Sequence, residues 1–201
     1  MMAPLMDLAA GFTDPARDSQ QVFRRVLAAT AYPGRIEAIG IALGPPPPLS
    51  IAGAALALTL LDLDVTLWLS PSLRDGIAPW LRFHAGCPIS VENDLSVDFA
   101  LVGRGDRMPP LSSARLDDPE RPDISTTLII ECDALMGGRP LLATGPGIDG
   151  SIALAPQGLP PHLWAEREAL WSFLPLGVDL FLAAGTELLA IPRTIHIEEM
   201  A

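Results

Sequence analysis

Two short stretches of the sequence bring an arginine and a histidine close together. Arg82 and His84 stand two residues apart, and Arg193 and His196 stand three apart. A guanidinium beside an imidazole can bind an anionic ligand, because both groups donate hydrogen bonds and the guanidinium is always charged. Arg82 and His84 also fall at the end of an expected helix, where the helix dipole alone favours positive side chains. Arg193 and His196 follow the last expected strand, at a sheet end, where α/β proteins often bind ligands.

A further candidate is Arg139, which directly follows Gly137 and Gly138. A turn there could aim the guanidinium at a phosphate or at a partner's carboxylate; otherwise Arg139 forms a surface ion pair of small energetic value. Asp62 and Asp64 fit pairing with arginine or capping of a turn better than catalysis. The five basic residues are therefore ligand or interface candidates, and the catalytic residues stay unassigned.

The 13 basic residues are all arginines, and the chain has no lysine. Without lysine there is no Schiff base to pyridoxal phosphate, no lysine nucleophile and no P-loop lysine. Any bound anion must therefore be held by arginine, by backbone N–H groups at a turn or helix start, or by a partner subunit.

Gly145, Gly147 and Gly150 form a G-x-G-x-x-G pattern, the spacing with which dinucleotide-binding folds contact a pyrophosphate. That site needs a helix directly after the glycines, because the helix N-terminus binds the phosphates. Here a short strand-like stretch closed by Pro156 follows, and Pro146 removes a donor from the turn. We therefore predict a tight turn between antiparallel strands, with a looser contact to a phosphate delivered by another chain as the remaining alternative.

Composition and charge exclude several classes of protein. With 49% apolar and 18% charged residues, the chain is expected to form a globular fold. Its net charge of -11 disfavours nucleic acid as a partner, because a polyanion would be repelled. The apolar run 49–61 is too short to span a membrane, and the first residues lack the basic region of a signal peptide. We therefore expect a cytoplasmic protein with no membrane contact.

Cysteine and histidine are too sparse for metal or redox chemistry of a familiar kind. Cys87 and Cys132 are far apart in the sequence, which predicts buried reduced thiols rather than a disulfide framework. The three histidines form no cluster with the spacing of zinc or iron ligands. We therefore expect no metal and no other cofactor.

Periodicity predicts helices that alternate with strands in the first half of the chain and paired strands in the second half. Helices are expected at residues 15–31, 50–61, 71–85 and 163–173. Strands are expected at residues 35–40, 65–69, 97–102, 128–131, 141–144, 151–154, 178–183 and 188–191. This order predicts an α/β fold, or an α+β variant of it: a three-layer domain with a mixed sheet flanked by helices. A single domain over residues 1–201 is expected, with the polar segment 104–127 as an exposed excursion.

Five blocks of the sequence, taken in order, carry a family resemblance. They are FRRVLAATAYPG (23–34), LTLLDLDVTLWLS (58–70), LRFHAGCP (81–88), GGRPLLATGPGI (137–148) and FLPLGVDLFLAAGTELLAIPRTIHIE (173–198). Together they resemble the PhnH family, the H subunits of the bacterial carbon–phosphorus lyase core complex of phosphonate metabolism. The likeness covers nearly the whole chain and weakens only in the segment 104–127.

The resemblance implies a fold similar to the large domain of pyridoxal-phosphate-dependent transferases without the cofactor, in agreement with the missing lysine. It also implies a homodimer that works with the G, I, J and L subunits. Together with G, I and L, such a subunit takes part in displacing adenine from ATP by a phosphonate, which gives a ribose 1-phosphonate 5-triphosphate. The later radical cleavage of the carbon–phosphorus bond belongs to the J subunit.

Two functional hypotheses remain open at this point. In the first, the chain is a structural or site-completing subunit of this multi-subunit transferase and is an enzyme only within that assembly. In the second, it is an independent dimeric enzyme that acts on a small anionic or nucleotide ligand.

Overall fold

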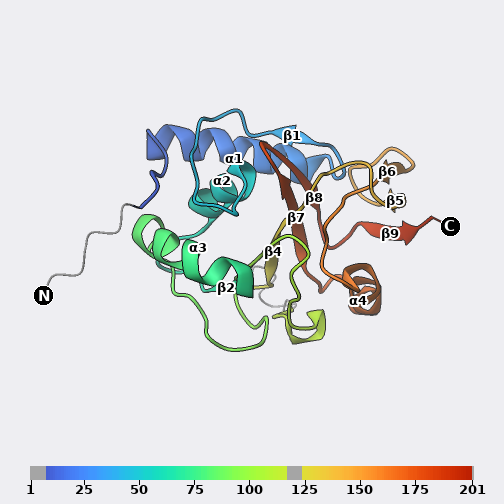
Figure 1. The fold of residues 1–201 in the computed structure, drawn as a ribbon. Coiled ribbons are helices and arrows are strands. Elements are labelled where there is room, and N and C mark those ends of the chain that lie inside the picture. Colours follow the sequence, from blue (N-terminus) through green and yellow to red (C-terminus); the bar gives the residue numbers. More distant parts are fainter. Residues whose placement is uncertain (1–7, 117–123, 201) are drawn as a thin grey trace, which may run out of the picture.

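A six-stranded mixed sheet forms the centre of the protein (Figure 1). The computed structural model describes residues 8–116 and 124–200. The sheet has the order β1-β8-β7-β4-β3-β2, in which β2, β3, β4 and β7 are parallel and β8 and β1 antiparallel to their neighbours. The strands are β1 (Glu37–Ala38), β2 (Leu67–Leu69), β3 (Phe99–Val102), β4 (Thr127–Glu131), β7 (Asp179–Ala184) and β8 (Glu187–Ile191). The mixed sheet of an α/β fold is therefore confirmed.

Three helices cover one face of this sheet (Figure 1). They are α1 (Pro15–Ala31), α2 (Ile51–Leu60) and α3 (Pro71–His84). Asp14 caps α1 by accepting the N–H of Arg17 at 3.2 Å, and the hydroxyl of Ser50 caps α2 by accepting the N–H of Gly53 at 2.9 Å. The helices expected at 15–31, 50–61 and 71–85 are confirmed to within a residue at each end.

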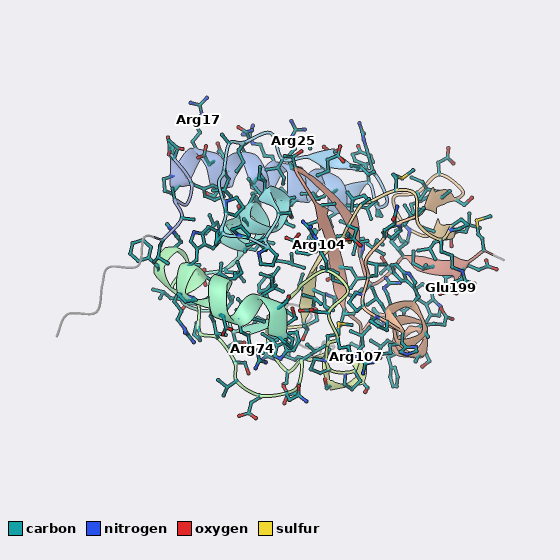
Figure 2. The ribbon with its side chains drawn as sticks, in the orientation of Figure 1. Arg17, Arg25, Arg74, Arg104, Arg107 and Glu199 are labelled. Carbon is teal, nitrogen blue, oxygen red and sulfur yellow. The ribbon has the colours of Figure 1, made fainter. Side chains whose placement is uncertain are left out.

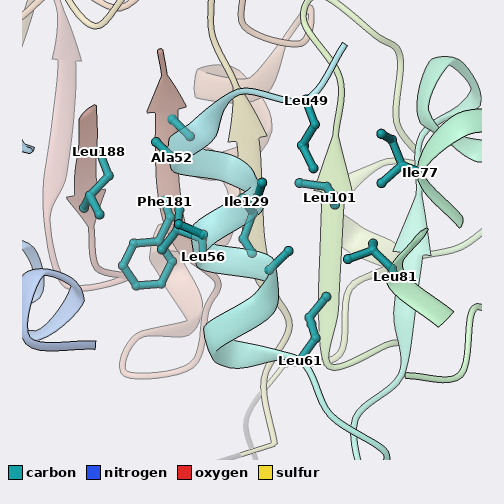
Figure 3. Packing of buried hydrophobic residues seen from close by; sticks show 14 of the residues in the cluster. Leu49, Ala52, Leu56, Leu61, Ile77, Leu81, Leu101, Ile129, Phe181 and Leu188 are labelled. Carbon is teal, nitrogen blue, oxygen red and sulfur yellow. The ribbon is translucent and has the colours of Figure 1, made fainter. Parts of the chain in front are cut away.

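Alternation along the parallel strands divides the core into two clusters. Leu101, Ile129 and Phe181 point to the helical face, where they pack with Leu56 of α2 and Leu81 of α3 (Figure 3). Their neighbours in the strands point to the opposite face and pack in the second cluster. Because these strands are buried on both faces, their sequences are almost continuously apolar. Full burial of each such side chain contributes about 1.5–3 kcal/mol.

The opposite face is covered by α4 (Leu163–Leu170) and by a second sheet of three strands in the order β6-β5-β9. The strands of this sheet are β5 (Leu141–Thr144), β6 (Ile152–Leu154) and β9 (His196–Glu199). Two short 3-10 turns, Leu111–Ser113 and Trp171–Phe173, complete this layer. The molecule thus has three layers, but the flanking layer on this side is a small sheet with one helix and not helices alone.

The glycine-rich loop joins β5 to β6, which pair antiparallel with Leu141 opposite Leu154. The antiparallel pairing predicted for these strands is confirmed, and no helix directly follows the glycines, but the connection is the loop 145–151 and not a tight turn. The hairpin predicted around Gly185 is also confirmed, because β7 and β8 pair antiparallel with Ala184 opposite Glu187.

Three expectations need correction. The last strand is not 188–191, because His196–Glu199 forms the additional strand β9. The strand expected at 35–40 shrinks to the two residues of β1, although Ile39 also donates its N–H to Thr186 in the neighbouring hairpin. The segment 104–127 is only partly exposed: Leu111 and Thr126 are fully buried, whereas residues 117–123 lie outside the described residues. Within residues 8–116 and 124–200, no helix combines the length and apolarity needed to cross a bilayer.

Candidate functional site

Arg193 forms a half-buried ion pair with Asp179 at the point where the two sheets meet. Its backbone N–H donates to Asp179 Oδ1 at 2.8 Å, and its guanidinium donates to both carboxylate oxygens. A second branch of the guanidinium donates to the hydroxyl of Ser125. The hairpin explains this contact, since Asp179 begins β7 and Arg193 follows the end of its partner β8.

Arg167 of α4 holds the segment between β8 and β9 from the other side. It donates to the carbonyl oxygens of Ile195 and Pro192, both at 2.7 Å. Burial lowers the pKa of Arg167 to about 10, although the charges of Asp179 and Glu168 oppose this shift. The Nε atom of Arg167 is buried and has no hydrogen-bond partner among the described residues.

The same burial affects the ionisation of the Asp179 carboxylate. Burial raises the pKa of Asp179 above its usual value, against the opposing effects of the Arg193 N–H and the Arg167 charge. Burial likewise lowers the pKa of Arg193. Desolvation therefore outweighs the attraction between these groups, as is common for buried ion pairs. The cluster fixes the path of the chain between the sheets and uses the groups that Arg193 would offer to a ligand.

His196 and Arg139 lie on the second sheet, each beside a glutamate. His196 lies 3.3 Å from Glu168 of α4, and its ring packs edge-on against Trp171 with centroids 4.9 Å apart. Arg139 forms an exposed ion pair of 2.9 Å with Glu199. A groove of about 530 Å³ runs between α4 and β9. It is lined by Trp164, Ala165, Glu168, His196, Ile197, Glu198 and Glu199.

Arg82 and His84 lie in the last turn of α3, on the other face of the six-stranded sheet. His84 Nε2 lies 3.0 Å from the carbonyl oxygen of Ala9, which also accepts the indole N–H of Trp80 at 2.8 Å. His84 therefore helps to dock the N-terminal segment onto α3. Arg82 is exposed and makes no hydrogen bond or ion pair with any other described residue.

The five candidate residues therefore lie in three separate places. Arg82 and His84 lie at the end of α3, Arg139 and His196 lie at the second sheet, and Arg193 lies at the junction between the sheets. The sequence patterns did not indicate three further residues with important contacts: Arg167, Asp179 and Glu131. For Arg167 a signal was present, because it lies at helical spacing between Leu163 and Leu170, which places its charge on the buried face of α4.

Glu131 lies at the carboxyl end of β4 and is fully buried. Its Oε1 atom accepts the backbone N–H of Ser50 at 3.0 Å and the Ser50 hydroxyl at 2.9 Å. Its Oε2 atom has no partner within the described residues. Burial raises the pKa of Glu131 to about 7, against the opposing effects of Ser50 and of the Arg104 charge (Figure 2 labels Arg104).

Near the start of α3, side-chain oxygen atoms likewise accept backbone N–H groups. The hydroxyl of Ser70 accepts the N–H of Gly103 at 2.8 Å, and Asp106 accepts the N–H of Ser72 at 3.1 Å. Burial raises the pKa of Asp106, but hydrogen bonds from Ser70 and Ser72 outweigh it and hold the pKa below its usual value. In α/β proteins this edge of the sheet binds anionic ligands at helix N-termini. Here oxygen atoms of the chain itself occupy such positions.

A hollow of about 280 Å³ lies at the opposite, amino end of the parallel strands. Its walls are mostly apolar and come from α1, α2 and the strand starts, with Asp179, Thr30 and Thr127 as polar groups. A carboxylate in an apolar hollow disfavours an anionic ligand. The hollow therefore gives no support to an independent enzyme that acts on nucleotides.

The cysteines are also unsuited to nucleophilic chemistry. Cys87 and Cys132 are free and buried. Burial raises the pKa of Cys87, and it raises that of Cys132 to about 12, so both are thiols near neutral pH. Across the described residues, no group of three or more histidine, cysteine or acidic side chains is placed to hold a metal ion.

Comparisons with known proteins give one consistent result. The sequence profile of the family described as "Bacterial phosphonate metabolism protein (PhnH)" matches residues 10–198. A Rhizobium meliloti (strain 1021) protein named "Alpha-D-ribose 1-methylphosphonate 5-triphosphate synthase subunit PhnH" is 41% identical over 202 residues, which cover 98% of this chain and 99% of that protein. A Stutzerimonas stutzeri protein named "Putative C-P lyase subunit protein HtxG" is 33% identical over 179 residues, covering 89% of this chain and 85% of that protein.

Proposed function

Because the chain belongs to the PhnH family, we propose that it is the H subunit of an alpha-D-ribose 1-methylphosphonate 5-triphosphate synthase in organic phosphonate catabolism. With the G, I and L subunits it contributes to the transfer of ribose triphosphate from ATP to methylphosphonate, with release of adenine. The observation that carries this proposal is the 41% identity to a synthase subunit over 98% of the chain.

The geometry supports a structural or site-completing role. Ser50 caps the start of α2, Asp106 accepts an N–H at the start of α3, and Arg193 is engaged with Asp179. Because Arg193 and these two helix starts are already used, the chain would depend on other subunits to complete a site for a triphosphate. It is an enzyme within the assembly, by this proposal, and not alone.

The proposed assembly is cytoplasmic and contains a homodimer of this chain, together with the G, I and J subunits and the L subunit. The two free, buried cysteines fit a reducing compartment. Arg82 is the candidate we assign to a partner contact, because its exposed guanidinium has no partner among the described residues.

We also propose that the fold is a cofactor-free relative of the large domain of pyridoxal-phosphate-dependent transferases. The parallel strands β2, β3, β4 and β7 followed by the antiparallel β8 support this relationship. The chain has no lysine with which to form the Schiff base. No pyridoxal phosphate should therefore be needed for the function of the subunit.

Release of adenine tests the proposed function directly. Purified chain is incubated with ATP and methylphosphonate, alone and with the G, I and L subunits, and free adenine is measured; reactions without methylphosphonate serve as controls. We expect adenine only when all subunits are present, and a loss of the product when this chain is left out. Adenine release by the chain alone would instead favour the independent enzyme.

A further inference from the structure

Strand β9 is an edge of the second sheet, since it pairs only with β5 in the order β6-β5-β9. Met200 donates its N–H to the carbonyl of Pro140 at 3.1 Å, next to this ladder. In an antiparallel pair the hydrogen-bonded positions alternate, so His196 and Glu198 direct their backbone groups toward β5. The backbone groups of Ile197 and Glu199 consequently point to the open edge. No other described residue hydrogen-bonds to them there.

The groove between β9 and α4 runs along this edge. In Figure 1, β9 lies between β5 and α4. Trp164 provides an apolar wall, and Glu168, Glu198 and Glu199 provide carboxylates. Among the described residues no arginine lines the groove, and Arg139 pairs with Glu199 beside it. The groove therefore combines unpaired strand groups, an aromatic surface and an excess of negative charge.

Charge argues against a second copy of this chain as the occupant. If two β9 strands paired antiparallel about Glu198, the carboxylate of Glu198 in one copy would face that of Glu198 in the other, and like charges placed opposite each other destabilise a sheet. Acidic side chains on an edge already discourage such pairing. A strand that carries lysine or arginine has the opposite preference.

We propose that the open edge of β9 and the groove beside α4 bind an extended basic segment of a neighbouring subunit by strand addition. The backbone of Ile197 and Glu199 pairs with the segment, its basic side chains contact Glu168 and Glu198, and an apolar side chain packs on Trp164. This inference rests on the proposed role of the chain as a subunit and names the chemistry of one of its contacts.

Amide hydrogen exchange tests the pairing at single residues. Exchange is measured for the isolated chain and for the chain assembled with the G, I and J subunits. The amides of Ile197 and Glu199 should exchange at least about tenfold more slowly in the assembly, because they gain hydrogen bonds there. The amide of Glu198 is an internal control, since it is already bonded to β5 and should be protected in both samples.

A charge reversal tests the basic nature of the segment. Glu198→Arg should weaken binding of the chain to the assembled partners by about tenfold. Glu92→Arg makes the same change in charge at an exposed loop outside the groove and should alter binding by less than about twofold. An equal loss in both variants would assign the effect to net charge and refute a basic segment in the groove.

The outcomes separate this inference from the proposed function. If the partners assemble and adenine is released, but Ile197 and Glu199 exchange as fast as in the isolated chain, strand addition is wrong and the subunit role stands. Protection that rises with the concentration of the isolated chain would identify a second copy as the occupant and overturn the inference. If no assembly forms with the unmodified chain, both proposals fail together.

Discussion

The carboxylate of Glu131 accepts two hydrogen bonds from Ser50, one from its backbone N–H at 3.0 Å and one from its hydroxyl at 2.9 Å. The hydroxyl in turn accepts the N–H of Gly53. The end of β4 is thereby tied to the start of α2, although the two residues are 81 positions apart in the sequence. A negative charge at this place is favoured by the helix dipole, but its burial is costly.

The ionisation of Glu131 should make the protein less stable as the pH rises. The pKa of Glu131 is about 7 in the folded protein and near its ordinary value of 4.5 in the unfolded chain. Between these values the folded state keeps a proton that the unfolded state has released, so the free energy of unfolding falls with pH. The total loss is roughly 3 kcal/mol and is complete above the folded pKa.

Glu131→Gln should remove this pH dependence, because glutamine is neutral throughout and can still accept the Ser50 hydrogen bonds. Urea unfolding of both proteins from pH 4.5 to 8 measures it. The variant should match the unmodified protein at the acidic end and exceed it in stability at pH 8. Glu92→Gln, at an exposed loop, is the control and should show a constant difference. A constant difference for Glu131→Gln as well would contradict the raised pKa.

Gly53→Ala should destabilise the protein despite the preference of helices for alanine. A Cβ atom at this position would collide with the carboxylate of Glu131, so the carboxylate or the helix must move. We expect a loss of about 1–3 kcal/mol, the usual cost of overpacking. Gly76→Ala in α3 is the matched control, because a Cβ there makes only ordinary contact and should stabilise by about 0.5–1 kcal/mol. Guanidinium unfolding of the two variants distinguishes them.

Much of the fold follows from local patterns in the sequence. The helix from 15 to 31 begins at Asp14-Pro15, a cap followed by proline at the first helical position, and the structure places it as predicted. The two-residue turn at Gly185 likewise defines the β7–β8 hairpin. The strand β9 was missed because its four residues alternate weakly and gain their pairing from β5, more than 50 positions earlier in the chain.

The candidate site was harder to predict, since its important contacts join residues distant in sequence. Arg193 was recognised as a cation near a sheet end, but its partner Asp179 lies across a hairpin whose register only the fold reveals. Glu131 appeared as the last residue of a buried strand. Nothing local indicated that its carboxylate would meet the start of α2.

Asp179→Asn should destabilise the protein, because the half-buried guanidinium of Arg193 loses the carboxylate that accepts its hydrogen bonds. Loss of hydrogen bonds to a charged group typically costs about 1.5–3 kcal/mol. Arg139→Ala is the contrasting variant, since its ion pair with Glu199 is exposed and should contribute less than about 1 kcal/mol. The free energies of unfolding in urea give both values. Similar losses in the two variants would show that the cluster around Asp179 has no special role.

Arg82→Ala should weaken assembly with the partner subunits while leaving the chain as stable as before. The guanidinium lies at the end of α3 without a hydrogen bond or ion pair to another described residue, so its removal costs the isolated chain less than about 1 kcal/mol. An exposed cation at an interface acts mainly on the rate and strength of association, and we expect binding weaker by several-fold.

Arg17→Ala is the control, since Arg17 lies on the exposed side of α1 (Figure 2). Titration of each variant with the assembled partners, followed by adenine release, measures the effect. Unchanged binding and turnover in Arg82→Ala would remove Arg82 from the interface and reduce its role to the helix dipole.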